Sequence, residues 1–362
     1  MNARDRLAWL RPLLLAGLVA AAAFIPAQRA LTRGDLPTTC VEPNRHMTMY
    51  AVELPREDGK PRLAYGLTPD TASIPGPTIK MIEGDCLAIT VVNTVSRDVL
   101  RELRDDPLLG SRDPDMPLGV SLHVHGVKYT QSSDGTFATN SWIPPDESRT
   151  YVWFAAPKIV AAGRVISQGT AGYWWYHDHV VGTDHGTGGA ASGLFGAVIV
   201  RRAGDVTPDR TYVVAMGPDA TLNLKRFPET DCPAEPSLED ASNSCYVAVQ
   251  GERVEFAVIG FGDDFHTFHL HGHNWADTRT GMLASQLDDS RLVDNKTVGP
   301  ADTFGFQIVA GEEVGPGSWM LHCHVQAHSD RGMVTFFHVF TPAGILLNSS
   351  APVELHEHFG RP

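Results

Sequence analysis

The stretch HCHVQAHSDRGM, residues 322–333, holds a thiol between two imidazoles, followed by another imidazole and a thioether. Alternate side chains of a β-strand point to the same face of the sheet. On a strand, His322 and His324 would therefore face one way and Cys323 would face the other. Cys323 would then bind one metal ion while its neighbours bind others, and the covalent link between them would give electrons a short path.

The same stretch, together with one upstream histidine, supplies the ligands of an electron-transfer site. Cys323, His266 and His328 would provide one thiolate and two imidazoles. Met333 would add a weak axial thioether. This donor set matches that of a blue-copper site, and it predicts one copper ion here.

Four His-x-His pairs predict a second metal site. Each pair sets two imidazoles side by side on one face of a strand. Eight imidazoles exceed the roughly four ligands of a zinc site, and imidazole suits copper. Imidazoles crowded together without a metal would also be costly to bury. We therefore predict a cluster of several copper ions. The pairs are His123/His125, His177/His179, His269/His271 and His322/His324.

The four pairs are divided evenly between two halves of the chain, as expected of a duplicated domain. Asp178 occupies the position in the first half that Cys323 occupies in the second. We therefore expect the blue-copper site in the second half alone. The two halves would share one cluster, to which only the second half passes electrons.

Short segments rich in Val, Ile, Thr and aromatic residues recur between Gly, Pro and Asp, which predicts β-strands. No long stretch after residue 30 has helical periodicity. We predict an all-β fold of two sandwiches, at about 40–205 and 206–345, joined near 201–209 and followed by a tail at 346–362. The expected strands include Leu87–Val92, Ser121–Val127, Thr150–Phe154, Phe195–Val200, Tyr212–Ala215, Val254–Ile259, Thr303–Val309 and Val334–Phe340.

Residues 1–30 predict export. Three arginines precede the uncharged run Leu13–Ile25, which is typical of a secretory signal and short of the ~20 residues of a membrane span. An uncleaved N-terminal anchor is the alternative. We expect a periplasmic or extracellular location. The formal net charge of −13 argues against a nucleic-acid or anionic-membrane partner.

Export makes disulfides possible among the four cysteines other than Cys323. Three pairings are open. Joining Cys232 to Cys245 would close a short loop rich in Pro, Ser and acidic residues, and joining Cys40 to Cys86 would tie the first strand of the mature chain to the body. Free buried thiols are the alternative, and we expect disulfides.

The chain resembles the multicopper oxidases, and most closely the two-domain small laccases, over about residues 40–340. The resemblance implies two cupredoxin-like Greek-key domains, with the type 1 copper in the second, and four copper ions per functional unit (one type 1, one type 2, two type 3). The segments that carry it are IPGPTIKMIEGD (74–85), HVHGVKY (123–129), WYHDHVVGTDHGTGG (175–189), HTFHLHGH (266–273) and HCHVQAHSDRGM (322–333).

The resemblance also implies a role for each ligand. Tyr129 and Asp134 match positions that in the family are linked to radical and proton handling. Asp178 would lie beside the ligand residues without binding copper itself. Trp175 and Lys128 depart from the small-laccase pattern, and we expect neither to touch a ligand. The implied ligands are His266, Cys323, His328 and Met333 for type 1; His123 and His269 for type 2; His125, His177 and His324 for one type 3 ion; and His179, His271 and His322 for the other.

By the same resemblance, phenols or aromatic amines would give single electrons at the type 1 copper, and Cys323 would pass them to the cluster. Dioxygen would take four electrons there and leave as water. The chain would form a homotrimer with its clusters between neighbouring chains. A copper nitrite reductase and a non-catalytic copper-binding protein are the alternatives. The four pairs and Asp178 oppose the first, and the link through Cys323 opposes the second.

Overall fold

The structure, a computed structural model, describes residues 34, 36, 39–40, 42–230, 232–233 and 235–347. The expected targeting segment at 1–30 lies outside the described residues, and so does the expected tail beyond residue 347. In the part of the chain that is described, no helix is long and apolar enough to span a membrane.

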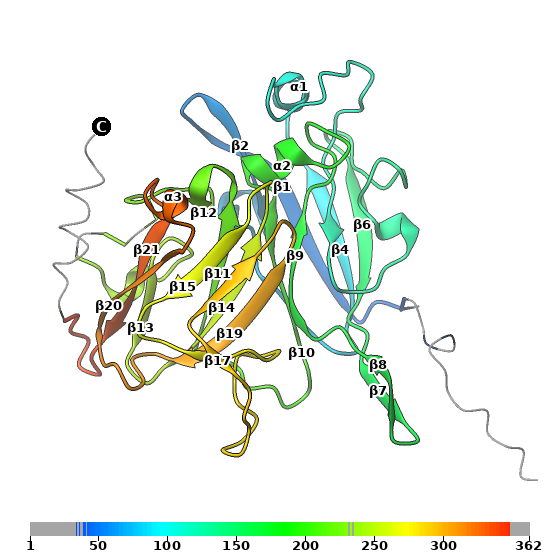
Figure 1. The fold of residues 1–362 in the computed structure, drawn as a ribbon. Coiled ribbons are helices and arrows are strands. Elements are labelled where there is room, and N and C mark those ends of the chain that lie inside the picture. Colours follow the sequence, from blue (N-terminus) through cyan, green and yellow to red (C-terminus); the bar gives the residue numbers. More distant parts are fainter. Residues whose placement is uncertain are drawn as a thin grey trace, which may run out of the picture.

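Two four-stranded sheets make up the first half of the chain (Figure 1). The first sheet has the order β2-β1-β4-β6: β1 (Arg45–Glu57), β2 (Lys60–Gly66), β4 (Cys86–Asn93) and β6 (Ser148–Phe154). The second has the order β3-β10-β9-β5: β3 (Ile79–Ile82), β5 (His123–Val124), β9 (Gly172–His177) and β10 (Phe195–Arg201). A hairpin of β7 (Lys158–Ala161) and β8 (Arg164–Gln168) projects from this half.

The second half repeats the arrangement with a third and a fourth sheet. The third has the order β12-β11-β14-β19: β11 (Arg210–Gly217), β12 (Thr221–Leu222), β14 (Arg253–Gly260) and β19 (Thr303–Val309). The fourth has the order β13-β21-β20-β15-β18: β13 (Tyr246–Val249), β15 (His266–Leu270), β18 (Asn295–Val298), β20 (Gly317–Cys323) and β21 (Val334–Phe340). β16 (Trp275–Ala276) pairs with β17 (Leu292–Val293).

Helices are short. The nine-residue α1 was not predicted, although its residues carry the signals of a helix: the Ser96 hydroxyl accepts from the Val99 amide as an N-cap, and Val99, Leu100 and Leu103 are buried on one face. The helices are α1 (Arg97–Asp105), α2 (Thr187–Ser192) and α3 (Gln326–Ser329), with 3-10 turns η2 (Pro69–Thr71), η3 (Gln131–Ser133), η4 (Pro218–Ala220) and η5 (Leu238–Asp240).

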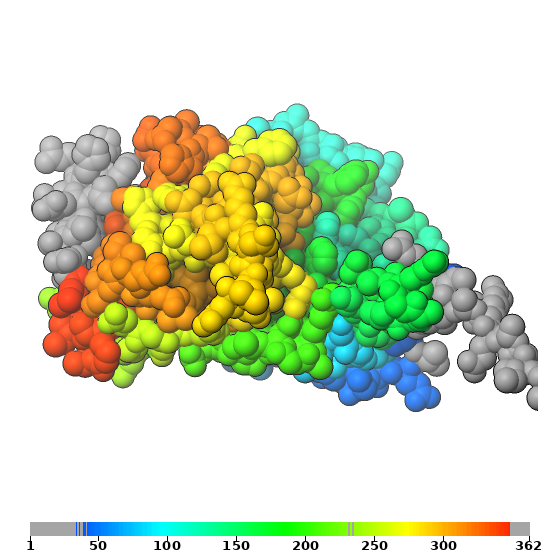
Figure 2. Space-filling model, turned by 60° about the horizontal axis from the view of Figure 1, so that its bottom comes forward, coloured from blue at the N-terminus to red at the C-terminus, as the bar shows by residue number. Residues whose placement is uncertain are grey.

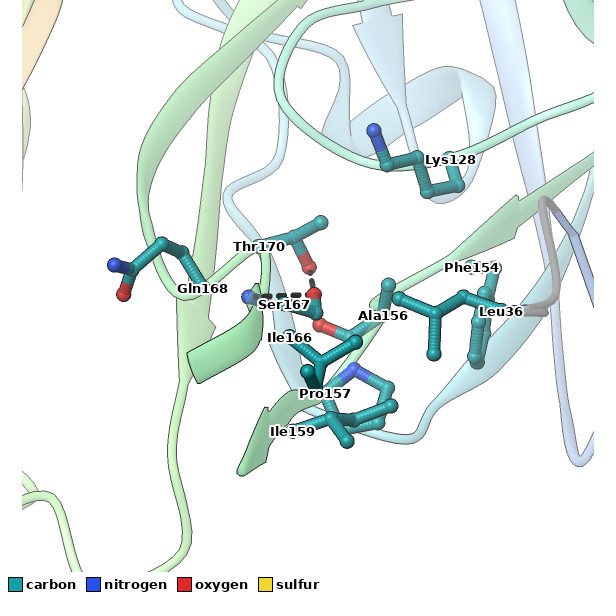
Figure 3. A pocket seen from close by; sticks show the side chains of 11 residues that line it. Leu36, Lys128, Phe154, Ala156, Pro157, Ile159, Ile166, Ser167, Gln168 and Thr170 are labelled. Carbon is teal, nitrogen blue, oxygen red and sulfur yellow. Dashed lines mark hydrogen bonds between the residues drawn. The ribbon is translucent and has the colours of Figure 1, made fainter. Parts of the chain in front are cut away.

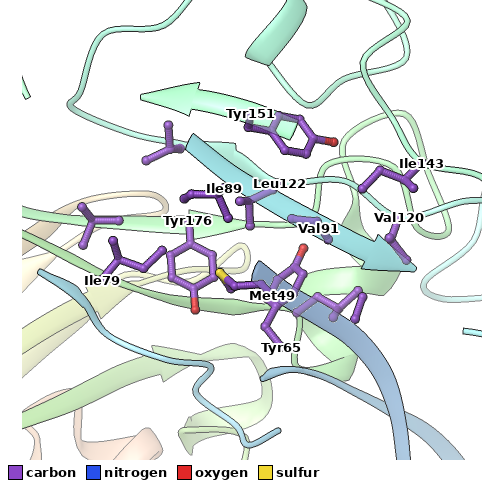
Figure 4. Close-up of a cluster of buried hydrophobic side chains, with 14 of the residues drawn as sticks. Met49, Tyr65, Ile79, Ile89, Val91, Val120, Leu122, Ile143, Tyr151 and Tyr176 are labelled. Carbon is purple, nitrogen blue, oxygen red and sulfur yellow. The ribbon is translucent and has the colours of Figure 1, made fainter. Parts of the chain in front are cut away.

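The four sheets lie in layers, and apolar side chains fill the three spaces between them. Tyr65, Met49 and Tyr176 meet in the core between the first two sheets (Figure 4). Phe256, Phe306 and other aromatic rings fill the core between the third and fourth sheets. The two halves lie side by side across the face that Figure 2 brings forward.

The two inner sheets are buried on both faces, which explains their continuous apolar runs. In β10, Val198 and Val200 pack into the first-half core, whereas Phe195 and Ile199 face the third sheet. β14 alternates in the same way between the second-half core and this middle layer. The middle layer fixes how the two halves sit relative to each other.

The predicted all-β fold is confirmed, and so is the expectation of disulfides. Of the three pairings left open by the sequence, the structure has Cys40–Cys86 with Cys232–Cys245. The predicted strand Ser121–Val127 is mostly wrong, because only His123–Val124 forms a strand there. Gly126 has a φ of +80°, a left-handed conformation that ends the extended backbone.

A buried ion pair joins the two halves beside the middle layer. Arg201, at the end of β10, donates from Nη2 to both carboxylate oxygens of Glu255 on β14, each at 2.6 Å. The Glu255 side chain is 1% exposed. It also accepts hydrogen bonds from Tyr173 (2.9 Å), Thr211 (3.1 Å) and Gln307 (3.3 Å). The buried Glu255 carboxylate is therefore stabilised by one cation and three neutral hydrogen-bond donors.

We predict that Arg201→Met destabilises the protein by about 3–5 kcal/mol, because it leaves the Glu255 carboxylate buried without its cation. Urea unfolding of both proteins would measure the difference. The double variant Arg201→Met/Glu255→Leu should regain most of the loss, since no charge stays buried. Arg101→Met is the control: its partner Asp98 is 91% exposed, so little change is expected. Equal stability of Arg201→Met and the parent protein would contradict the prediction.

Candidate metal centres

A thiol and two imidazoles converge inside the second half. They come from three elements: His266 begins β15, Cys323 ends β20 and His328 lies in α3. The Nδ1 atoms of the two histidines are 3.2 Å apart, and Cys323 Sγ lies 3.7 Å from His328 Nδ1. All three residues are buried, with donor atoms within 4.8 Å of one another.

Met333 lies at the same place. Its side chain is buried, and its backbone is paired with two residues of the site. The Cys323 amide donates to the Met333 carbonyl at 3.1 Å, and the Met333 amide donates to the His328 carbonyl at 3.0 Å. The structure thus brings together the four residues predicted for the type 1 site, and we call them the thiol site.

The electrostatics of the thiol site suit a cation. Burial, with the nearby His328, lowers the pKa of His266 to about 4, which keeps its ring neutral. The buried Nε2 of His266 has no hydrogen-bond partner among the described residues. Burial raises the pKa of the free thiol Cys323, so a bound cation would be needed to favour the thiolate. Two imidazoles, a thiol and a thioether fit copper.

Four imidazoles gather at the edge of the second sheet. Strand pairing places His123 on β5 directly opposite His177 on β9. The Nε2 atoms of His125 and His177 are 3.3 Å apart. The His179 ring centre is 5.0 Å from that of His123. We call these four residues the first half-site.

The second half contains an equivalent group. Strand pairing places His269 on β15 opposite His322 on β20. The Nε2 atoms of His271 and His322 are 3.2 Å apart. The His324 ring centre is 5.4 Å from that of His269. We call these four residues the second half-site.

Matching hydrogen bonds orient the rings of the two half-sites. His123 and His269 each donate from Nδ1 to a carbonyl, of Asp134 at 2.6 Å and of Asp294 at 2.9 Å. His177 and His322 donate from Nδ1 to the carbonyl of the following residue, at 2.7 and 2.8 Å. These four rings therefore keep Nε2 available to a metal ion.

Pleating of β20 sets the thiol site and the second half-site on opposite faces of one strand. Cys323 packs into the interior core with Leu321, whereas His322 points to the outer face, beside His269. The carbonyl of Cys323 accepts the hydrogen bond from His322 Nδ1. One peptide and one hydrogen bond thus connect the two groups.

The two half-sites do not meet within one chain. His177 shares the face of β9 that carries Trp175, directed toward the third sheet. His269 and His322 lie on the outer face of the fourth sheet, beyond the second-half core. Among the described residues, the donor atoms of the two half-sites form separate groups. Each chain therefore offers two partial sites.

Burial lowers the pKa of several half-site imidazoles and so favours their neutral form. Burial, together with the charges that His123 and His179 would carry, lowers the pKa of His125 to about 4. Burial likewise lowers the pKa of His322, against the effect of its backbone hydrogen bond. Neutral imidazoles can bind a metal ion without first losing a proton.

Three predicted supporting residues lie beside the first half-site. Asp178 is fully buried and accepts from the amides of Ser121, Val180 and Val181, and burial raises its pKa to about 7. The Tyr129 ring centre is 6.0 Å from that of His123. Burial, and then the charge of Asp134, raises the pKa of Tyr129.

The expectation that Trp175 touches no ligand is wrong. Its indole ring stacks on His177, with ring centres 4.1 Å apart and planes 19° apart. The indole N–H is buried and has no hydrogen-bond partner in the described part of the chain. Residues two apart on a strand share a face, so the spacing from Trp175 to His177 was the signal that sequence reasoning missed.

A cavity of about 460 Å³ lies elsewhere in the first half (Figure 3). It is lined mainly by apolar side chains such as Phe154, Pro157 and Ile159, with Lys128 at its edge. None of the candidate ligands lines it. The metal centres are therefore separate from this cavity.

Comparison with known proteins places the chain among copper proteins. Two family models, both described as "Multicopper oxidase", match residues 115–205 and 214–342, together more than half of the chain. The first match contains the first half-site and the second contains the thiol site and the second half-site.

Curated relatives are much longer than this chain. A "Probable nitrite reductase-hydroxylamine oxidoreductase fusion protein" of Kuenenia stuttgartiensis is 30% identical over 285 residues, which cover 76% of this chain and 28% of that protein. Ceruloplasmin of Rattus norvegicus is 27% identical over 255 residues, 60% of this chain and 21% of that protein. The chain thus spans about a quarter of the length of these relatives.

Solved structures share the fold. One described as "Crystal structure of multicopper oxidase" superposes with a TM-score of 0.54 at 21% identity, covering 81% of this chain and 87% of that one. A blue copper oxidase from Nitrosomonas europaea superposes with a TM-score of 0.53 at 20% identity, covering 88% of this chain and 95% of that one. A copper nitrite reductase from the same organism superposes with a TM-score of 0.51 at 18% identity, covering 85% of this chain and 95% of that one. The two family matches, on a fold of this kind, show that the chain belongs to the multicopper oxidases, a family of copper-dependent oxidoreductases.

Proposed function

We propose that this protein is a two-domain laccase-type oxidase. It would oxidise phenols or aromatic amines one electron at a time and pass four electrons to dioxygen, which leaves as water. The observation that carries the proposal is the alternation at the end of β20. Cys323 faces His328 within the core, while His322 beside it faces His269 on the outer surface.

The chain's own residues would provide the route for electrons. Bound copper would supply the redox chemistry of both donor oxidation and oxygen reduction. Cys323, His266, His328 and Met333 would hold the type 1 ion in a buried, water-poor site. The peptide after His322 and the hydrogen bond from His322 Nδ1 to the Cys323 carbonyl would then link the thiol site to the cluster.

The remaining three ions of the four-copper set would lie between a first and a second half-site. His123 and His269 would hold the type 2 ion. The type 3 ions would be held by His125, His177 and His324, and by His179, His271 and His322. Tyr129 and Asp134, close to His123, would handle protons and radicals there.

We further propose that neighbouring chains complete the cluster in a homotrimer. The two half-sites of one chain are separated by the second-half core, so a second copy must supply the missing imidazoles. A first half-site that meets the second half-site of the next chain makes a head-to-tail contact, and such contacts form a ring, here a trimer, when the rotation between neighbours closes.

Reduction of nitrite is the second candidate, and the fusion protein of Kuenenia stuttgartiensis favours it by name. A reductase of that kind would carry its type 1 cysteine in the first half, where this chain has Asp178. It would also leave eight clustered imidazoles unexplained. We therefore favour the oxidase. The two disulfides fit the proposed export to the periplasm or the extracellular space.

We expect the copper-loaded protein to consume dioxygen when it is given a phenol such as 2,6-dimethoxyphenol. An oxygen electrode would measure the uptake, and metal analysis would give four copper ions per chain, because each chain contributes one type 1 site and one cluster interface. Turnover of nitrite without oxygen uptake would replace the oxidase with the reductase. One ion per chain and no turnover would leave a copper-binding protein.

Cys323→Ser should abolish the intense visible absorption of the type 1 site and stop donor oxidation, because a hydroxyl is a poor copper ligand. Optical and paramagnetic spectra of the variant would report the loss. Cluster copper should remain, since its proposed imidazoles are unchanged. Intense colour in this variant would refute the assignment of the thiol site.

Chain mixing tests the shared cluster. His123→Ala/His125→Ala and His269→Ala/His271→Ala should each be inactive alone. Co-expressed, they should regain about a quarter of the parent activity, since one interface in four in a randomly mixed head-to-tail ring joins two intact half-sites. A chain with all four substitutions, co-expressed with either variant, is the control and should restore nothing. Failure of the two variants to complement each other would exclude clusters between chains.

A further inference from the structure

The cavity in the first half is large enough for a small organic molecule (Figure 3). Its volume of about 460 Å³ lies within the range of roughly 300–1,000 Å³ that is usual for small-molecule sites. Phe154, at the end of β6, forms one wall, and the hairpin contributes Ile159 from β7 and Ile166 from β8. Leu36 adds a side chain from the segment before the disulfide-bonded Cys40. Three separate segments of the chain therefore meet around the cavity.

Buried polar contacts hold both ends of the hairpin against the body of the first half. The Glu83 carboxylate, whose side chain is 9% exposed, accepts from the amide of Lys158 at 3.1 Å and from that of Ala171 at 3.3 Å. Thr170 donates from its amide (2.9 Å) and from its hydroxyl (3.3 Å) to the carbonyl of Ala156. The cavity is therefore a fixed part of the fold and does not lie beneath a loose loop.

The lining of the cavity suits an aromatic ring. Phe154, Pro157 and Ile159 present apolar surfaces to it, and aromatic ligands bury a large apolar area against such side chains. The hydroxyl of Ser167 already accepts from the amide of Gly169 at 3.1 Å. An apolar group that enters the cavity would therefore displace water without leaving this hydroxyl wholly unsatisfied.

Lys128 is the one charged residue among the described residues that line the cavity. It is exposed at the cavity edge, and no carboxylate in the described part of the chain lies within ion-pair distance of its Nζ. The nearby Glu83 is already paired with Arg202 at 3.3 Å. An unpaired ammonium beside an apolar wall attracts a ligand that combines an anionic group with an apolar one.

We propose that this cavity binds a small aromatic carboxylate. Its ring would lie between Phe154 and the hairpin, and its carboxylate would lie beside Lys128. Because none of the candidate metal ligands lines the cavity, binding there does not depend on the proposed function. The cavity would be a second binding site, separate from both metal centres.

Two inert probes test the site without any turnover. 2-Naphthoate and 2-naphthamide share a naphthalene ring, and only the first is charged. Isothermal titration calorimetry of the copper-loaded protein at pH 7 would give their dissociation constants. We expect one naphthoate to bind per chain, and the amide to bind about threefold to fivefold more weakly, the range of an exposed charge pair. Salt at 0.5 M should reduce the difference.

Lys128→Gln should weaken naphthoate binding by about the same factor, to the affinity of the amide, because it removes the cation. Binding of the amide itself should not change. Lys158→Gln is the matched control: it removes the same charge from the hairpin, but its side chain does not line the cavity, so its effect should be clearly smaller. Equal affinity of the parent protein for the two probes would overturn the proposal, and so would unchanged naphthoate binding in Lys128→Gln.

A larger side chain inside the cavity tests the place of binding. Ala156 lines the cavity and is 9% exposed, so Ala156→Leu should fill part of the space and weaken both probes about tenfold or more. The copper spectra of the variant would show whether it is folded and loaded. Ser167→Leu, on the hairpin, makes the same test if Ala156→Leu does not fold. Unchanged binding of naphthoate by a folded filled variant would place the probe elsewhere and refute the site.

Discussion

The alternation of side chains at the end of β20 is the constraint on which the metal chemistry depends. Neighbouring residues of a strand must face opposite sides of the sheet. Cys323 therefore reaches the core of the second half only if His322 reaches the outer face, beside His269. A shift of one residue in the pairing of β15 and β20 would place the thiol outside and the imidazole inside. The buried partners of Cys323 hold that register.

The middle layer then determines where the two half-sites lie. Because β10 and β14 are buried on both faces, the halves are packed as closely as a core, and the buried Arg201–Glu255 pair adds a directional contact. This packing leaves the second half-site on the outermost sheet and the first near the middle layer. In the proposed cluster, a second chain is needed because the apolar surfaces of β10 and β14, far from the imidazoles, hold the two half-sites of one chain apart.

Residue spacing along the chain was enough to predict much of this arrangement, because the spacing of two residues on a strand determines whether their side chains face the same side of the sheet. The two rings of each His-x-His pair lie together, with centres 4.8–5.6 Å apart, although only the first histidine of each pair lies within a strand. Cys323 and His322 face opposite sides as the pleat requires, and β19 and β21 match the predicted strands. Contacts between distant elements could not be predicted in this way. The proximity of Asp264 to His328 joins a loop to a helix 64 residues later. The stacking of Trp175 was predictable from its spacing and was missed.

Burial lowers the pKa of imidazole donors and raises the pKa of a thiol donor, and both shifts favour the neutral form. It lowers the pKa of His125 and His266 to about 4, which removes protons from imidazole, and it raises the pKa of Cys323, which keeps a proton on sulfur. Each donor is therefore neutral near pH 7. A copper ion that binds at the thiol site must displace the proton of Cys323, whereas an ion that binds a neutral imidazole such as that of His125 displaces none. Copper binding at the thiol site should therefore weaken with acidity over a wider pH range than binding at the half-sites.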